Sequence, residues 1–204
     1  MSRYRGPRLR LTRRLGNLPG LITKESNRKK TPGQHGKEIN DNNTKPTEFG
    51  LRLEEKQKIK FNYGLTESQL FQYLKEGRRR RGVTSLVLLQ LLEMRLDTIC
   101  YTLGFGKSIA HARQLINHGH VTVNNKIVSI PSLQCKINDI VGIKDKSTSI
   151  NLIKANVEAY QSELLSHLEF DPSKLKSKIV NYCMREDLAL SLNELLVIEY
   201  YSRR

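Results

Sequence analysis

Cysteine is scarce in this chain of 204 residues: Cys100, Cys135 and Cys183 are the only three, and they lie far apart. Zinc-binding sequences commonly carry paired cysteines at close spacing, such as Cys-x-x-Cys, and that pattern is missing. A disulfide framework would need a denser, even-numbered set of cysteines. The sequence therefore predicts neither a metal site nor disulfides, and it favours a reducing compartment.

Long apolar runs are also missing. The longest, over residues 85–92, is interrupted by Gln90 and is much shorter than the roughly 20 residues of a membrane span. The sequence contains no apolar core typical of a signal peptide. The Arg-rich, acid-poor start is compatible with an organelle transit peptide, but Gly6, Pro7 and the glycines within residues 16–20 interrupt an amphipathic helix there. We therefore expect no membrane partner.

Positive charge is what the chain has in excess. Its 35 Lys and Arg against 20 Asp and Glu give a net charge of +15. Residues 1–45 hold 12 basic and 3 acidic residues, whereas residues 147–204 hold 7 and 8. This balance favours a polyanionic partner, meaning nucleic acid or an anionic membrane surface. The basic partner surface is therefore predicted in the first three quarters of the chain.

Residues 1–47 are rich in glycine and proline and contain few large apolar residues. Such a segment buries too little surface to fold alone, so we expect an extended chain that becomes ordered on its partner. The alternative is a disordered basic tail that only adds non-specific affinity. The arginines predicted to contact RNA here are Arg3, Arg5, Arg8, Arg10, Arg13 and Arg14.

Two helices are predicted next. Residues 48–62 suit a helix, and a second begins at Thr66, which forms a capping box with Gln69. Gly77 is expected just beyond its C-terminus. The apolar face of the second helix consists of Leu70, Phe71 and Leu74.

Four consecutive arginines follow the second helix. Adjacent like charges repel one another unless anions lie nearby, so the run predicts phosphate contacts. A solvated charge run is the alternative interpretation. The four residues are Arg78, Arg79, Arg80 and Arg81.

Residues 84–103 have apolar side chains at continuous helical spacing, which predicts one buried helix ended by Gly104 and Gly106. Residues 107–118 predict another, with Ser108 as its N-cap and Gly119 at its end. Its inward face consists of Ile109, Ala112 and Ile116.

A β-hairpin is predicted after these helices. Residues 121–123 and 127–128 alternate around Asn124 and Asn125, and asparagine tolerates the positive φ angles of a tight turn. Residues 136–143 predict a further strand pair. Beyond these, the pattern is ambiguous, with a helix expected around residues 157–168 and an apolar stretch over residues 186–200.

The helix-turn-helix-hairpin leaves cations and hydrogen-bonding groups on one open face. Such a face suits RNA, whose irregular junctions are recognised through shape, phosphates and 2′-hydroxyls. A DNA-reading helix-turn-helix is the rival, but that motif is usually followed by no hairpin and acts as a dimer. The predicted RNA-binding residues of this region are Arg95, Lys107, Ser108, Arg113, Gln114, His118, His120 and Lys126.

Three nearby histidines, His111, His118 and His120, could also suggest a metal site. The first two are seven residues apart, so helical rise separates them by roughly 10 Å. No acidic residue or cysteine joins them. We therefore expect no metal and no cofactor.

Residues 95–143 resemble the small RNA-binding module named after S4, the fourth protein of the small ribosomal subunit. The residues that carry the likeness are 95–97, 108, 112–116, 119–124 and 131. The flanks resemble the ribosomal protein family itself, at residues 3–8, 13–16, 32–36, 53–57, 63–65 and 194–203. The likeness includes Gln34 and His35, which it adds to the predicted RNA-binding residues.

Residues 18–21, residues 199–203 and the lack of a cysteine zinc knuckle resemble the plastid version of this family. The resemblance therefore implies the chloroplast stroma, on the ribosome, with the bacterial cytoplasm as the alternative. Asn125 departs from the family, which usually has glycine at that turn, and residues 144–185 match it poorly.

The resemblance implies an α+β fold that is mainly α with a small β-sheet. A helical domain would receive the inserted RNA-binding module, with an extended basic segment before it. The boundaries expected are 1–47 for the basic segment, 48–92 with 188–204 for the helical domain, 93–146 for the module and 147–187 for an extension of the module.

Asp97 could suggest catalysis, because some pseudouridine synthases carry this kind of module and use an aspartate loop. Here Asp97 falls within a continuous helical pattern, and no large catalytic domain remains. We therefore interpret Asp97 as a surface carboxylate and expect no enzyme, in keeping with the lack of a P-loop.

By this resemblance the chain is a structural constituent of the small ribosomal subunit. Its partners would be 16S-type rRNA, at a multi-helix junction of the 5′ domain, and a neighbouring S5-type protein near the mRNA entry channel. No homo-oligomer is expected. The runner-up is a free RNA-binding regulator or an RNA-chaperone-like factor.

Overall fold

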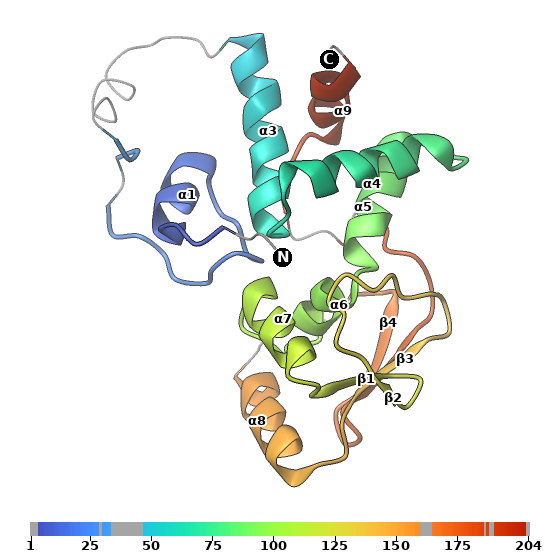
Figure 1. The fold of residues 1–204 in the computed structure, drawn as a ribbon. Coiled ribbons are helices and arrows are strands. Elements are labelled where there is room, and N and C mark those ends of the chain that lie inside the picture. Colours follow the sequence, from blue (N-terminus) through green and yellow to red (C-terminus); the bar gives the residue numbers. More distant parts are fainter. Residues whose placement is uncertain are drawn as a thin grey trace. The chain divides into compact units, whose positions relative to one another are not determined.

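A computed structural model describes residues 4–28, 30–33, 47–159, 165–185, 187 and 190–202 (Figure 1). The chain divides into two compact units, one of residues 1–85 with 189–204 and one of residues 86–188. The described elements are mainly helices with one five-stranded antiparallel sheet, which confirms the predicted α+β fold class. No helix among these residues is long and apolar enough to cross a bilayer.

The first unit is helical. It contains α1 (Arg8–Leu15), α3 (Glu48–Asn62), α4 (Glu67–Arg79) and α9 (Glu194–Ser202). Helices α3 and α9 lie side by side although they come from opposite ends of the chain (Figure 1). The apolar stretch near the end of the sequence therefore completes a helical unit that begins before residue 50.

The N-terminal segment is more folded than predicted. Pro7 precedes α1, where its fixed φ suits a helix start, and Gly16 ends the helix at φ 85°. Leu15, Leu18 and Leu21 are buried, so the segment has a small apolar side. The prediction of an extended chain was wrong for residues 8–15, because the glycines and prolines that were read as breakers flank the helix instead. Arg3, Gln34 and His35 lie outside the described residues.

A buried cation fixes α4 and α9 beside α3. Lys56 on α3 has a side chain only 5% exposed, and its Nζ lies 2.9 Å from Glu67 Oε1 on α4. The Tyr201 hydroxyl on α9 donates to the same oxygen at 2.7 Å. Arg52 reaches Glu199 on α9 at 2.8 Å. Glu67 therefore connects three helices through one carboxylate.

The start of α4 was predicted correctly and its end was not. Thr66 and Gln69 form the predicted capping box. Gly77, however, lies buried inside the helix, which continues to Arg79. A glycine without a side chain can pack against a neighbouring element in a helix interior, so its presence alone does not mark the end.

In the second unit the predicted continuous helix over residues 84–103 is two helices. These are α5 (Thr84–Glu93), which runs in from the end of the first unit, and α6 (Leu96–Thr102). Between them Arg95 is extended, at φ −76° and ψ 140°. Backbone bonds from Leu96 to Leu133 and from Cys135 to Met94, both 2.9 Å, hold this break against a distant loop.

The sheet has the strand order β2-β1-β3-β5-β4, and every pair is antiparallel. Its strands are β1 (Val121–Val123), β2 (Lys126–Ile127), β3 (Ile140–Ile143), β4 (Leu168–Asp171) and β5 (Lys176–Ile179). The predicted turn is confirmed, with Asn124 and Asn125 at φ 50° and 62°. The strand predicted from residue 136 begins only at Ile140.

Two further helices complete the second unit. Helix α7 (Ile109–Asn117) follows the predicted Ser108 cap, whose side chain accepts from His111 N–H. Helix α8 (Ser147–Glu158) lies earlier than the helix predicted over residues 157–168. Ile153 is fully buried and defines the inward side of α8, whereas residues 168–171 pair with β5 as a strand.

One apolar core joins the helices to the sheet in this unit. Its members come from α6, α7, α8 and strands β1, β3 and β5. They include Leu96, Ile99, Ile116, Val121, Val141, Ile153 and Ile179, all at most 1% exposed. The sheet, α6, α7 and the β1–β2 hairpin therefore pack together around one apolar core.

We predict that Glu67→Gln destabilises the first unit and flattens its pH dependence. Burial acts to raise the pKa of Glu67, but hydrogen bonds from Lys56 and Tyr201 outweigh it, and the net pKa is lowered from 4.5. A lowered folded pKa gives stability above the unfolded pKa that is lost as the pH falls through the folded one. Denaturant unfolding between about pH 6 and 3 should show a larger loss of stability in the parent than in the variant.

Exposed Glu25→Gln is the matched control, because Glu25 belongs to the same unit and has no ion-pair partner among the described residues. A parent and a Glu67→Gln variant with the same stability at every pH would contradict the role of this carboxylate.

Candidate RNA-binding surface

A buried aspartate organises the turn between α5 and α6. Asp97 is fully buried and accepts hydrogen bonds from Arg95 Nε at 2.9 Å, Arg95 Nη2 at 2.7 Å and Thr98 N–H at 3.0 Å. It lies in the first turn of α6, where the helix dipole favours a negative charge. The expectation that Asp97 is a surface carboxylate was wrong, because two arginine side chains enclose it.

The second arginine is Arg113 on α7. Its Nε lies 2.6 Å from Asp97 Oδ2, and its side chain remains 20% exposed. The Asp97 carboxylate thus holds α7 against the start of α6. Arg113 at the same time remains partly accessible to solvent. Arg95, by contrast, is only 3% exposed, so it lies inside the unit and away from the open face where the sequence placed it.

Helix α7 has a buried side and an open side. Ile109, Ala112, Leu115 and Ile116 are buried, whereas Gln114 is exposed, as are Lys107 just before the helix and His118 at its C-cap. This alternation follows from apolar residues at spacings of three and four. We call the exposed residues Lys107, Gln114 and His118, together with half-exposed Arg113, the α7 face. The structure places Lys107, Gln114 and His118 away from the core as predicted, whereas Arg113 is 20% exposed and pairs with buried Asp97.

The histidines of this region are hydrogen-bonded or exposed. His111 Nδ1 accepts from the Lys107 N–H at 3.3 Å, and burial, with the charge of Lys107, lowers its pKa. His120 Nδ1 pairs with Ser149 Oγ at 2.9 Å, which joins the end of α7 to α8. His118 is exposed, with its ring centroid 6.1 Å from that of His120. In the described part of the chain, these three form no cluster with metal-ligand spacing.

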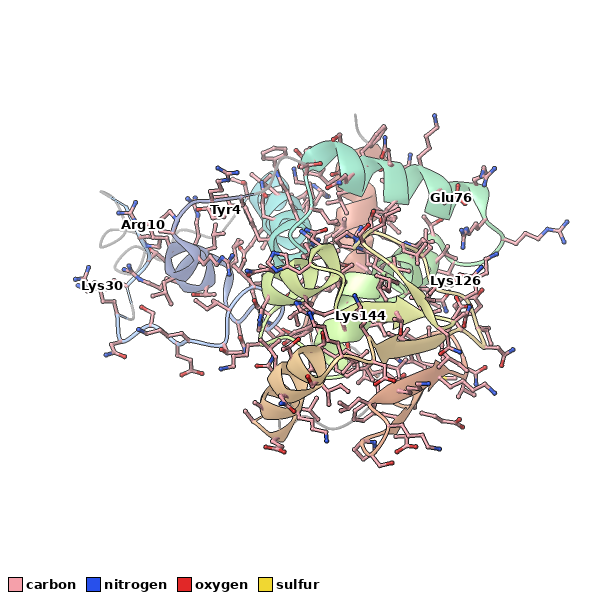
Figure 2. All side chains as sticks on the ribbon, turned by 60° about the horizontal axis from the view of Figure 1, so that its bottom comes forward. Tyr4, Arg10, Lys30, Glu76, Lys126 and Lys144 are labelled. Carbon is pink, nitrogen blue, oxygen red and sulfur yellow. The ribbon has the colours of Figure 1, made fainter. Side chains whose placement is uncertain are left out.

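The hairpin presents its own cation beside a rigid turn. Lys126 follows the two asparagines and is exposed, and Figure 2 shows it with Lys144 on the second unit. The Asn124 side chain donates to Asp139 at 2.9 Å and accepts from Ile140 N–H at 2.9 Å. These bonds hold the turn in a left-handed conformation that asparagine tolerates.

The arginines predicted to contact RNA in the described part of the N-terminal segment fall into two groups. Arg8 and Arg13 donate to backbone carbonyls, at 3.5 Å to Leu21 and 3.0 Å to Lys30. The others are exposed, and Figure 2 shows Arg10 and Lys30 on this segment. The exposed group consists of Arg5, Arg10 and Arg14.

The arginine run after α4 is also divided. Arg79 and Arg80 each lie 3.0 Å from Glu76, and their hydrogen bonds lower the pKa of that carboxyl. Arg78 and Arg81 are exposed and have no acidic partner within ion-pair distance among the described residues. The i,i+3 and i,i+4 spacing from Glu76 was a sequence signal for this division.

The sequence did not single out a basic hollow on the second unit. It has a volume of about 540 Å³ and lies between the sheet and α8, where Lys154, Lys174 and Lys176 line it with Asn125. Its lysines come from a region in which the helix was predicted too late in the chain and no strand was predicted. Alternating lysines at 176 and 178 were the available signal for the exposed face of a strand.

We predict that Asp97→Asn destabilises the second unit by roughly 3–5 kcal/mol, the usual cost of leaving a buried charge without its partner. The guanidinium groups of Arg95 and Arg113 would then face a neutral amide in place of a carboxylate. Chemical denaturation measures the loss, with exposed Asp145→Asn as the control. A loss no larger than that of the control would show that Asp97 does not organise this turn.

Two family models match the sequence, one described as the ribosomal protein S4/S9 N-terminal domain over residues 3–93 and one as the S4 domain over residues 94–141. A protein named small ribosomal subunit protein uS4c from Trieres chinensis is 66% identical, and one from Phaeodactylum tricornutum is 62% identical. A uS4 protein from Nostoc punctiforme is 53% identical. Each alignment covers 100% of both chains. This chain therefore belongs to the uS4 family of small ribosomal subunit proteins.

Proposed function

We propose that this chain is a structural constituent of the plastid small ribosomal subunit and that it binds rRNA through the α7 face. The observation that carries the proposal is the position of exposed Lys107 and Gln114 beside an arginine fixed by a buried carboxylate. A cation, an amide and an imidazole on a rigid helix suit the phosphates and 2′-hydroxyls of folded RNA. Full-length similarity to uS4 and uS4c proteins supports the target and the compartment.

Binding rests on two separable contributions. Exposed arginines of the first unit, including Arg10, Arg14, Arg78 and Arg81, neutralise phosphates and supply affinity without orientation. The α7 face supplies orientation, because its side chains project from a helix packed on the sheet. Arg95 acts in this proposal as a positioning residue, since its guanidinium is buried against Asp97.

Family resemblance supports further details that belong to the proposal. The rRNA contact lies at a multi-helix junction of the 5′ domain, where the protein nucleates assembly. An S5-type protein is its neighbour near the mRNA entry channel. The chain acts without catalysis, in keeping with the engagement of Asp97 by four hydrogen-bond donors from three residues of the protein itself.

The alternative is a free RNA-binding regulator that uses the same module. The two functions differ in stoichiometry and in salt resistance. A ribosomal constituent sediments with small subunits, one copy each, after a high-salt wash, whereas a regulator is released into the soluble fraction. Recovery of the chain only in the soluble fraction would support the regulator.

We predict that Lys107→Glu weakens binding to an rRNA fragment that contains the junction by about tenfold or more, since one reversed contact costs on the order of 1–3 kcal/mol. Filter binding at fixed salt measures the change. Lys146→Glu, just before α8, is the matched control, because it alters the net charge equally at an exposed residue outside both the α7 face and the basic hollow. Equal losses for the two variants would indicate that only net charge matters.

The salt dependence gives a second test. If roughly 6–10 phosphates are contacted, affinity falls roughly 10³–10⁵-fold between about 50 and 200 mM salt. We predict that joint replacement of Arg78 and Arg81 by Gln lowers the slope of log affinity against log salt by about 2. Joint replacement of Arg79 and Arg80 removes the same charge but lowers it less, since Glu76 already pairs with both. An unchanged slope in the first variant would contradict phosphate contacts at this run.

A further inference from the structure

Three potential metal ligands meet in the second unit, outside the α7 face. They are His167, which precedes β4, Cys183, which follows β5, and Asp187. One ligand atom from each lies within 4.8 Å of the other two. The antiparallel pairing of β4 with β5 explains the meeting, since Val180 N–H donates to His167 O at 3.0 Å and brings the ends of the hairpin together.

The histidine in this cluster has an unsatisfied nitrogen. His167 is 2% exposed, and its Nδ1 is buried without a hydrogen-bond partner. A buried polar group without a partner is destabilising, so a buried imidazole nitrogen normally has a hydrogen-bond partner. An additional ligand for this nitrogen would remove the cost.

We propose that His167, Cys183 and Asp187 bind one Zn²⁺ ion. Imidazole nitrogen, thiolate sulfur and carboxylate oxygen are the three donor types that zinc accepts in proteins. The sulfur and nitrogen donors argue against Mg²⁺ and Ca²⁺, which prefer oxygen ligands. Water would occupy the fourth coordination position.

Hydrogen bonds from neighbouring residues hold the proposed ligands in place, as outer-shell groups do around bound metal ions. Asp187 Oδ2 accepts from Ser166 Oγ at 2.9 Å and from Met184 N–H at 3.2 Å, which fixes the carboxylate. Gln90 on α5 donates to Cys183 O at 3.5 Å. Zinc here would tie the open end of the β4–β5 hairpin, beside α5, into a closed loop.

Coordination requires a proton to leave. Burial, helped by the charges of Glu93 and Asp187, raises the pKa of the Cys183 thiol to about 12, so the metal-free protein holds it protonated. Zinc binding forms the zinc–sulfur bond and releases this proton to solvent, with no change of oxidation state. Burial lowers the pKa of His167 although Asp187 acts to raise it, and the neutral imidazole keeps a lone pair for the metal.

The test uses the full chain after removal of metals with a chelator. Titration with Zn²⁺ against a chromophoric chelator should give one tightly bound ion, and Co²⁺ should give a thiolate-to-cobalt charge-transfer band with tetrahedral visible absorption. Cys183→Ser should abolish the charge-transfer band. Cys183→Ser and His167→Gln should each weaken zinc at least as much as loss of an outer-shell partner, about 10–100-fold.

Controls separate this site from other thiols and imidazoles. Cys135→Ser and His118→Gln should leave zinc affinity and the cobalt band unchanged. Asp187→Asn is the further variant if a buried replacement prevents folding, because Asp187 is only half-buried. Circular dichroism of each metal-free variant checks the fold.

Two results would overturn the proposal. One is the absence of a stoichiometric zinc ion and of the charge-transfer band in the folded parent. The other is zinc affinity that Cys183→Ser, His167→Gln and Asp187→Asn all leave unchanged, which would assign the ion to other residues.

Discussion

A single buried carboxylate determines the arrangement on which the RNA-binding region depends. Asp97 accepts hydrogen bonds from its chain neighbours Arg95 and Thr98 and from Arg113, which lies 16 residues further along the chain on α7. Its negative charge holds α7 against α6 and keeps Arg95 inside. Because buried ion pairs seldom add net stability, their value here lies in fixing one geometry. The orientation of Lys107 and Gln114 depends on that geometry.

The charge of the protein is less freely available than the composition suggests. Arg79 and Arg80 are engaged by Glu76, Arg95 by Asp97, and Lys56 by Glu67. Intramolecular pairing therefore divides the basic residues into those that shape the fold and those that face solvent. A net charge of +15 describes attraction at long range, whereas the close contacts depend on the smaller, exposed set.

Local chemistry could be predicted from the sequence where it acts within a few residues. The Thr66–Gln69 cap and the Asn124–Asn125 turn need only their neighbours, as do the exposed positions of Gln114 on α7 and of Lys107 and His118 at its two ends. The break at Arg95 could not be predicted, because apolar spacing continues through it and the loop around residues 131–135 imposes it. The cluster of His167 and Cys183 could not be predicted for a similar reason. These two residues are separated by 15 residues along the chain, and only the pairing of β4 with β5 brings them together.

The pairing of α3 with α9 has a consequence for the order in which the protein forms. The second unit is one continuous stretch of chain, residues 86–188, inserted in the sequence between the two parts of the first unit. During synthesis, α9 leaves the ribosome after every strand of the sheet. The second unit can therefore fold while the helical unit still waits for its last helix, since domains generally fold as units as they emerge. A nascent chain would thus present the module to RNA before its own helical domain is closed.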